Sequence, residues 1–122
     1  MANEITVQNS VLIRNGYFNL DFVPGKFQIT QTALGQYNEI NTIATSETTV
    51  VLTGSITAPR VCILYNLDAT NFCEFGWTTA VYGMKLFPAS MPSIFELAPG
   101  KTTLYLKADT AATDVLIIAC EA

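Results

Sequence analysis

The 122-residue sequence contains no histidine. Histidine is the commonest general base, so its absence removes the Ser-His-Asp and Cys-His nucleophile systems, and it also removes most zinc sites. The seven glycines are dispersed and form no phosphate-binding loop. Glycosidase catalysis needs only two carboxylates and no histidine, so it is not excluded by composition. However, acids such as Glu47, Glu74 and Glu96 occur singly at alternating strand positions, as on a solvated face. We therefore predict a protein that is not an enzyme, with no catalytic residue, cofactor or metal.

Charged residues are scarce. They make up 13% of the chain, against roughly 25% in an average soluble domain, while 50% of the residues are hydrophobic. The net charge is −4, and the six basic residues are scattered singly. A basic footprint for phosphate is missing, so we expect no nucleic-acid partner and no anionic membrane partner. Two interpretations of the low charge stay open: another subunit covers part of the surface, or a tightly packed β-domain exposes threonine and asparagine.

Long apolar runs and targeting signals are also missing. The start MANEITVQNS has neither the basic residues nor the apolar core of a signal peptide, and no run approaches the roughly 18 residues of a membrane span. Cys62, Cys73 and Cys120 match no zinc spacing and lie inside apolar runs, so we expect buried free thiols. Cys62 and Cys73 could lie on adjacent strands, but their spacing establishes no disulfide. These features predict a soluble protein in a reducing cytoplasm, with no membrane contact.

The residues that are present favour strands. Threonine, valine, isoleucine and aromatic residues dominate the candidate elements, and no segment keeps a 3.6-residue apolar period over three turns. The nearest helical candidate, residues 30–40, contains Gly35 and many polar residues, and we expect a loop or a short helical turn there. Residues 4–13 alternate strictly. Because successive side chains of a strand point to opposite faces, one face carries Ile5, Val7, Val11 and Ile13.

Further strand candidates recur about every ten residues. They cover residues 17–23, 26–32, 48–54, 60–66, 71–77, 81–87, 93–97, 102–108 and 115–120. The runs 48–54 and 60–66 are continuously apolar, which predicts cover on both faces. This spacing predicts an all-β fold, an antiparallel, jelly-roll-like β-sandwich of about eight to ten short strands. We expect a single domain over residues 1–122, with residues 1–24 acting as an arm or an edge strand.

Proline and glycine mark the expected connections. Pro24-Gly25 predicts a turn, and Pro99-Gly100 suits the centre of a type II turn. The segment LFPASMPSIF, residues 86–95, carries two prolines and cannot pair continuously. We expect it to cross from one sheet to the other.

The stretch YNLDATNFCEFGW, residues 65–77, holds a polar group between two apolar runs. Its oxygen-bearing side chains are those of Asn66, Asp68, Thr70 and Asn71. Calcium prefers six or more oxygen ligands with several carboxylates, and here Asp109 and Asp114 would add carboxylates only if the two segments lie together. Asparagine and aspartate also bond the backbone of turns. We therefore expect a hairpin whose turn is held by Asn66, Asp68 and Asn71.

Aromatic residues provide the candidate contact sites. Most of those in the second half should pack in the core, although exposed ones could stack on sugar rings or contact a subunit. Trp77, at a strand end, is the strongest candidate for an interface anchor. Phe18, Leu20 and Phe22 alternate with polar residues and share a face, as in an edge strand or an arm that reaches a neighbour. We assign as candidate interface residues Phe18, Phe22, Trp77 and Phe87.

Three segments carry a family resemblance. They read FQITQTALGQYNEINTIATSETTVVL, NLDATNFCEFGW and LFPASMPSIFELAPGKTTLYLKADTAATDVLIIACE, and together span residues 27–121. They resemble small virion structural proteins of tailed bacteriophages and prophages. The resemblance implies a virion β-sandwich protein assembled in the host cytoplasm, and it supplies no catalytic residues.

Within a virion, the resemblance leaves two roles open. The first is a capsid decoration or cement protein that stabilises the phage head by burying apolar surface between subunits. Its partners would be the major capsid protein or other virion proteins, and it would form a homo-oligomer, with a trimer as our expectation. The N-terminal MANEITVQNSVLI could then add a strand to a neighbour's sheet. The second role is a tail, baseplate or fibre-associated subunit that binds a host glycan.

Overall fold

The computed structural model describes residues 4–31, 33–52, 56–98 and 100–121. The chain divides into two compact units, with the boundary between residues 32 and 33. Every regular element of the described residues is a β-strand, and all the pairings are antiparallel. The all-β class predicted from the sequence is therefore confirmed.

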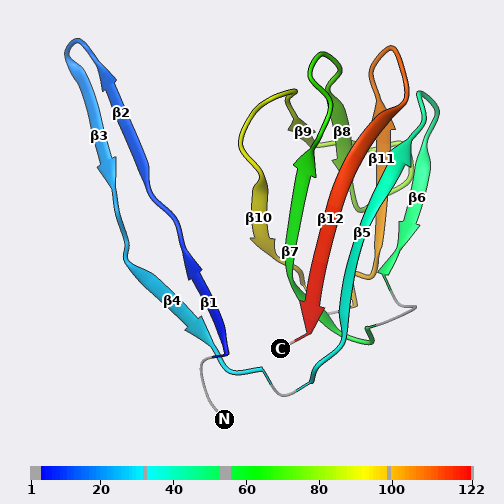
Figure 1. Ribbon diagram of the computed structural model, residues 1–122, viewed down its shortest axis with the longest axis horizontal. Helices are drawn as coiled ribbons and strands as arrows, with labels where there is room; N and C mark the ends of the chain where they lie inside the picture. Colours follow the sequence, from blue (N-terminus) through cyan, green and yellow to red (C-terminus); the bar gives the residue numbers. More distant parts are fainter. Residues whose placement is uncertain (1–3, 32, 53–55, 99, 122) are drawn as a thin grey trace. The chain divides into compact units, whose positions relative to one another are not determined.

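The first unit is a two-stranded ribbon (Figure 1). Its strands are β1 (Ile5–Gln8), β2 (Val11–Asn15), β3 (Phe18–Phe22) and β4 (Lys26–Ile29). β2 pairs with β3, and β1 pairs with β4. The chain reverses between Asn15 and Phe18 through a two-residue loop, where Gly16 has φ +57°. Glycine reaches this left-handed conformation without steric cost, which favours the tight turn here.

The predicted turn at Pro24-Gly25 is wrong, because the chain does not reverse there. The pairs on either side are Val11 with Phe22 and Gln8 with Lys26. Three residues, 23–25, thus oppose two residues, 9–10. One extra residue in one strand produces a bulge, and Gly25 adopts φ +92° within it. Because the same two chain segments pair on both sides of the bulge, residues 5–29 form one interrupted hairpin.

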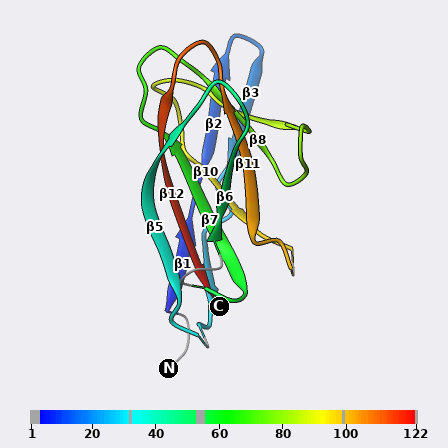
Figure 2. The ribbon, with the colours of Figure 1, turned by 90° about the vertical axis from the view of Figure 1, so that its right-hand side faces the viewer.

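The second unit contains two four-stranded sheets (Figures 1 and 2). The first sheet, in the order β10-β7-β12-β5, consists of β5 (Gln36–Ile43), β7 (Pro59–Asn66), β10 (Ser93–Glu96) and β12 (Thr113–Glu121). The second, in the order β6-β11-β8-β9, consists of β6 (Thr48–Val51), β8 (Cys73–Gly76), β9 (Met84–Leu86) and β11 (Thr103–Ala108).

The connections of this unit pass from sheet to sheet. From β5 to β12, only β8 and β9 are neighbours both in sequence and within a sheet. Counted along the chain, the first sheet takes the first, third, sixth and eighth of these strands, and the second sheet takes the others. Such interleaving of two Greek keys is the jelly-roll arrangement. The jelly-roll-like sandwich predicted from the sequence is confirmed.

The core fills the space between the two sheets. Side chains from both sheets are fully buried there, including Leu64, Phe75, Leu104, Leu106, Val115 and Ile117. Cys62 and Cys73 are buried free thiols, as predicted, whereas Cys120 is free but only half-buried. They lie on β7 and β8, which belong to different sheets, so the suggestion that they occupy adjacent strands is wrong. Burial raises the pKa of Cys62 to about 12 and that of Cys73 to about 11, which keeps both thiols protonated.

Two local predictions fail for the same reason. Residues 36–43 form β5, an edge strand paired with β12 over eight residues, rather than a loop or helical turn. Residues 65–77 do not form a hairpin, because β7 and β8 lie in different sheets. β5 pairs with β12, and β7 pairs with β10 and β12. These partners are distant in sequence, and local residue patterns do not identify them.

Two connections that the sequence predicted, a crossing between the sheets and a turn, can be compared with the structure. The proline-containing segment 87–92 crosses from β9 to β10, between the two sheets, as predicted. At the expected type II turn, the Lys101 N–H donates to the Ala98 carbonyl at 3.1 Å, and Gly100 has φ +83°. Pro99 itself lies outside the described residues, as do residues 53 and 54 of the predicted strand 48–54.

Candidate functional site

The polar stretch between β7 and β8 is held by its own side chains. Asn66 is 3% exposed, and its Oδ1 accepts a 2.8 Å hydrogen bond from the Asp68 N–H. The Asn66 Nδ2 donates to the carbonyl oxygens of Asn71 at 2.9 Å and Leu86 at 3.1 Å. Because buried amides need hydrogen-bond partners, Asn66 fixes this connection against the end of β9.

Asp68 bonds the next part of the same connection. Its Oδ1 accepts 2.7 Å hydrogen bonds from the N–H groups of Asn71 and Thr70. Donors to a carboxylate favour its charged form, and these two, with Asn71 the stronger, lower the pKa of Asp68. The predicted bonding of the local backbone is confirmed for Asn66 and Asp68, although the segment joins two sheets instead of closing a hairpin. The Asn71 side chain, in contrast, bonds the side chains of Asp68, Thr70 and Thr110.

The connections β7–β8 and β11–β12 do lie together, as a calcium site would require. The Thr110 Oγ1 donates to the Asn71 Oδ1 at 2.7 Å, and the Asp109 N–H donates to the Phe72 carbonyl at 3.0 Å. The Asp114 carboxylate, however, accepts a 2.7 Å hydrogen bond from Thr42. In the part of the chain that the structure describes, no three histidine, cysteine, aspartate or glutamate side chains are placed to hold a metal ion.

Two further carboxylates hold connections of the sandwich. The Glu47 Oε1 accepts 2.6 Å hydrogen bonds from the Tyr82 hydroxyl and the Ala80 N–H. The Tyr82 bond is the main cause that lowers the pKa of Glu47, and the same bond raises the pKa of Tyr82 to about 12. A general acid needs a raised carboxyl pKa. Glu47 instead remains ionised and ties residues 80–82 to the segment before β6.

Glu121, at the end of β12, is 7% exposed. Its carboxylate accepts hydrogen bonds from the N–H groups of Thr57, Ala58 at 3.2 Å and Gly35 at 3.1 Å. These donors, Thr57 first, lower its pKa. A Cβ at Gly35 would stand 2.7 Å from the Glu121 Oε2, so glycine is required for this approach. The buried carboxylate therefore serves the structure of this end of the sandwich.

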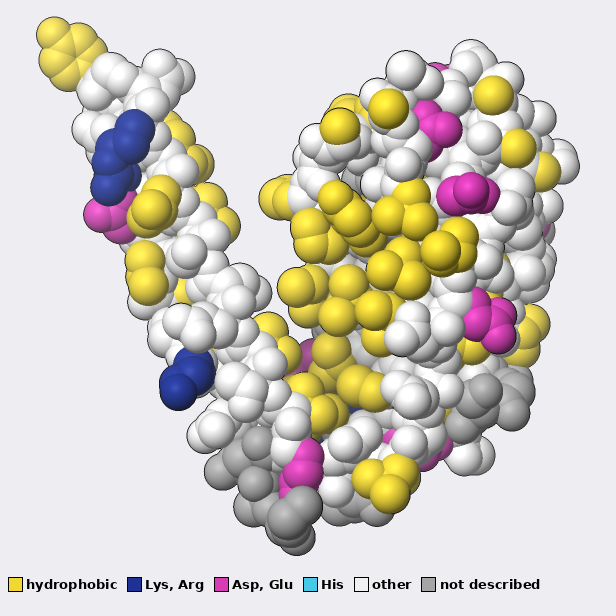
Figure 3. Space-filling view, viewed as in Figure 1, with side chains coloured by type: hydrophobic (Ala, Val, Ile, Leu, Met, Phe, Trp, Pro, Cys, Tyr) yellow, Lys and Arg dark blue, Asp and Glu magenta, His cyan; other side chains and the backbone are white. Residues whose placement is uncertain are grey.

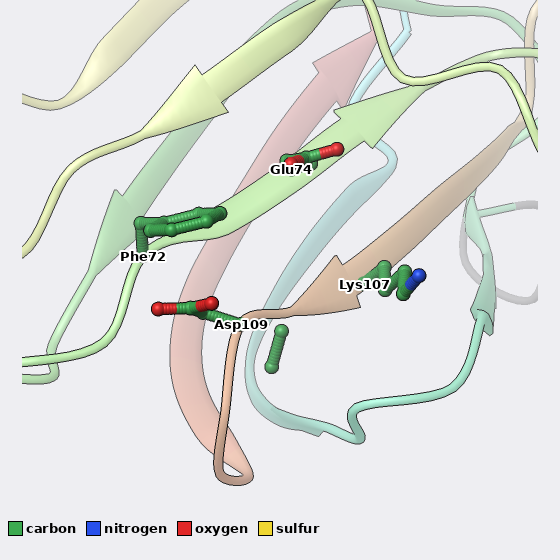
Figure 4. A pocket seen from close by; sticks show the side chains of 5 residues that line it. Phe72, Glu74, Lys107 and Asp109 are labelled. Atoms are coloured by element: carbon green, nitrogen blue, oxygen red, sulfur yellow. The ribbon is translucent and has the colours of Figure 1, made fainter.

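A small pocket opens beside the polar connections. It has a volume of about 120 Å³ and is lined by Phe72, Glu74, Lys107, Ala108 and Asp109. Figure 4 shows the Lys107 ammonium directed away from the Asp109 carboxylate, so these charges do not converge on one point. Small-molecule sites usually measure roughly 300–1,000 Å³. The pocket is too small to enclose a ligand of that class.

Trp77 packs at the edge of the core. Its ring meets Phe75 edge-to-face at 5.9 Å and Phe95 at 5.4 Å between centroids. The buried Nε1 has no hydrogen-bond partner among the described residues. Beside the ring, a shallow pocket of about 220 Å³ is lined by Trp77, Glu96, Leu97, Ala98 and Lys101. Much of the indole is therefore engaged within the sandwich, and its role as an interface anchor stays a prediction.

Phe87 follows β9 and is 58% exposed. The Lys85 ammonium lies 5.5 Å from its ring centroid and 4.0 Å from that of Phe72. Trp77 and Phe87 follow opposite ends of the β8–β9 pair. The structure therefore does not join these two predicted contact residues in one surface.

Phe18 and Phe22 do share a surface, on β3 of the hairpin. They are 59% and 55% exposed. Alternation and cross-strand register assign nine apolar residues to one side of the ribbon, which we call the apolar hairpin face: Ile5, Val7, Val11, Ile13, Phe18, Leu20, Phe22, Phe27 and Ile29. The other side carries polar pairs such as Thr6–Gln28 and an ion pair between Arg14 and Asp21. The hairpin thus has one apolar and one polar side.

The bulge keeps this apolar face continuous. Apart from Leu12, which pairs with Asp21 on the other side, apolar positions are odd-numbered from Ile5 to Ile13. On the returning strand they change from even, at residues 18–22, to odd, at Phe27 and Ile29. In a strand, a shift of one residue moves side chains to the opposite face. The extra residue in segment 23–25 supplies that shift, so the second apolar set stays in phase with the first.

A second apolar surface lies on the outside of the first sheet, and the sequence assignment of contact residues missed it. Inward-facing residues of β7 and β12, such as Leu64 and Ile117, are fully buried and alternate with half-buried apolar residues. The outward set, which we call the apolar sheet face, is Ile40, Ile63, Tyr65, Ile94, Leu116 and Ile118. Figure 3 shows hydrophobic side chains gathered across the middle of this face. The continuous apolar run 60–66 was the signal for it.

The outside of the second sheet is different. On that face, the cross-strand register brings five side chains into adjacent positions: Thr49, Glu74, Lys85, Tyr105 and Lys107. Glu74 stands between Lys85 and Lys107 across the sheet. Charged and hydroxyl groups suit contact with water, so the two outer faces of the sandwich differ in chemistry.

Comparison of the chain with protein-family profiles, curated proteins and solved structures finds no match. Within the described ranges, no helix is both long enough and apolar enough to span a bilayer.

Proposed function

We propose that this chain is a non-enzymatic virion structural protein of a tailed phage, and specifically a capsid decoration or cement protein. It would be assembled in the host cytoplasm, act as a homo-oligomer (a trimer in our proposal), and contact the major capsid protein or another virion protein. The observation that carries the proposal is the apolar hairpin face. The resemblance of residues 27–121 to virion structural proteins supports it.

The hairpin needs contact with another strand or layer to be stable. A two-stranded ribbon in water is marginally stable at best, and it needs a third strand or a second layer. Here one side of the ribbon exposes Val11, Phe18, Leu20, Phe22 and Phe27 by 43–59% each. Contiguous apolar surface of this kind marks an interaction site. A subunit that stabilises a shell through its neighbours would use such an element.

The size of the face indicates how it would act. Covering it would remove on the order of 600 Å² of apolar surface from water, which corresponds to roughly 15 kcal/mol at about 25 cal/mol per Å². Association costs roughly 4–15 kcal/mol in lost freedom of motion. One hairpin contact therefore leaves a surplus of roughly 0–11 kcal/mol, and several contacts within an oligomer would strengthen attachment to a shell.

Cryo-electron microscopy of purified phage particles tests this proposal. We expect density for the sandwich on the outside of the head, with the hairpin in contact with a neighbouring subunit. An acidic protein suits this side of the shell, away from the packaged DNA. Density for the chain in the tail alone, or its absence from particles, would contradict the proposal.

A second candidate is a tail, baseplate or fibre-associated subunit that binds a host glycan. It is supported by the shallow pocket beside Trp77, which combines an aromatic ring with Glu96 and Lys101. A glycan array probed with the wild type and with Trp77→Ala tests it, and Phe87→Ala serves as the control because Phe87 lies outside this pocket. Failure of the wild type to bind any glycan would reject this candidate.

A further inference from the structure

The chain carries two apolar surfaces with matching properties. The apolar hairpin face belongs to a ribbon with no second layer of its own, and the apolar sheet face lies on the outside of the first sheet. Across that sheet, register joins Ile94 to Ile63 and Ile63 to Ile118 in one row, and Tyr65 to Leu116 and Leu116 to Ile40 in the next. Ile40 and Ile94 remain 62% and 42% exposed.

Both surfaces exclude charge from their centres. The ion pair of the hairpin, Arg14 with Asp21, is on the polar side of the ribbon. On the first sheet, Arg60 lies 3.8 Å from Glu96 near one end of the sheet, and Asp114 bonds Thr42 near the other. A contact between the two apolar faces would therefore bury no unpaired charge, which is the usual electrostatic cost of an interface.

The β2–β3 part of the apolar hairpin face also matches the first sheet in size. Each strand of the β2–β3 ribbon has five residues, or roughly 17 Å at about 3.4 Å per residue. Four strands at about 4.8 Å spacing measure roughly 15 Å across. The ribbon can thus lie on the sheet as an additional layer, at the roughly 10 Å separation of packed sheets.

We infer that the apolar hairpin face of one copy packs on the apolar sheet face of a second copy. The occupant of the sheet is thus a second copy of this chain, because every copy brings both surfaces in equal number and one kind of contact covers both. Such a contact joins different patches on the two copies, so it repeats around a ring and closes when the rotation permits. A second copy of the chain is thus the partner that the hairpin contacts. The contact between copies rests on the proposed function only for the statement that it occurs in a virion.

Light scattering of the purified full chain is the first test. We expect a molar mass of at least two chains, each of 13.3 kDa. Phe22→Thr on the hairpin and Leu116→Thr on the sheet should each reduce the mass to that of the monomer, because each removes apolar contact while keeping a strand-forming residue. A monomeric wild type would overturn the inference.

Matched controls separate the contact from general loss of structure. Leu12→Thr changes an exposed residue on the polar side of the same hairpin, and Val51→Thr changes one on the outside of the second sheet. Both variants should keep the oligomeric mass. Circular dichroism should show that all four variants are folded. If Leu116→Thr dissociates the oligomer but Phe22→Thr does not, the two copies join sheet to sheet and the inference is wrong.

Cysteine pairing tests which copy supplies the hairpin. In a Cys120→Ser background, Phe22→Cys and Leu116→Cys are made as separate variants and mixed under mild oxidation. We expect a disulfide-linked dimer in the mixture at several times the yield of either variant alone. A third variant carries both cysteines in one chain. If a disulfide forms only within that single chain, the hairpin lies on its own sheet and the inference is overturned. Virion association could still hold after that outcome, so the two proposals fail separately.

Discussion

Asn66 illustrates how single side chains hold the connections between sheets. Its amide is nearly inaccessible to water and makes three hydrogen bonds to backbone groups of the connection and of β9. The sequence predicted its local role, because asparagine commonly bonds the backbone of a nearby turn. Its bond to Leu86, twenty residues away, could not be predicted from a local pattern.

At this scale we predict that Asn66→Ala destabilises the protein by about 2–3 kcal/mol. The substitution leaves the buried carbonyl of Leu86 and the part-buried backbone groups of Asp68 and Asn71 without their partner. Each lost partner of a buried group costs roughly 1–3 kcal/mol before relaxation and entry of water. Urea unfolding followed by circular dichroism measures the change. Asn38→Ala, at an exposed position of β5, should change stability by less than about 0.5 kcal/mol. Equal effects for the two variants would contradict the assigned role.

At the scale of elements, carboxylates hold the ends of the sandwich. Asp68, Glu47 and Glu121 each accept hydrogen bonds from backbone N–H groups of the connections, and each has a lowered pKa. From the sequence, Glu47 was expected on a solvated face, and only Asp68 was expected to bond the backbone. Only the folded chain shows that their partners come from other connections, at Ala80 for Glu47 and at Thr57 for Glu121.

These shifts predict that acid destabilises the sandwich. A carboxyl with a lowered folded pKa contributes stability that is fully present above its unfolded pKa, about 4, and is lost as pH falls through the folded value. We therefore expect the urea midpoint to decrease steadily below about pH 5. Asp68→Asn should have a lower midpoint at pH 7 and a weaker decrease toward pH 3. A wild-type midpoint that does not change between pH 3 and pH 6 would refute this prediction.

At the scale of the whole molecule, the two units differ in what stabilises them. The second unit has its own buried core between two sheets, whereas the hairpin has a single layer. The sequence anticipated an arm or edge strand in residues 1–24, and in the structure the ribbon extends through β4 to Ile29. The bulge at 23–25 explains the extension, because it lets pairing continue past the residues that read as a turn.

We predict that residues 33–122 fold without the hairpin. Their unfolding should remain cooperative, because the core cluster lies wholly within this part of the chain. A peptide of residues 1–32 should show little strand structure in water, as expected for an isolated ribbon. Circular dichroism and thermal unfolding of both fragments measure this. A disordered 33–122 fragment would show that the sandwich depends on the hairpin for its stability.

The sequence by itself determined the strand class and the two-sided character of the hairpin. Both follow from residue type and from a period of two, which a strand imposes on every side chain along it. The continuous run 60–66 likewise indicated apolar residues on both faces of β7. These are local properties, and they do not depend on which strand is the neighbour.

Only the tertiary structure decided which strands pair and which connections cross between the sheets. β5, a largely polar strand, is defined by its eight pairs with β12, seventy or more residues away. The stretch 65–77 has residues suited to a hairpin, yet β7 pairs with β10 and β12 in the first sheet and β8 with β9 and β11 in the second. Sheet membership depends on burial and hydrogen bonding with distant strands. For this reason, the apolar sheet face, assembled from four strands, is visible only in the folded chain.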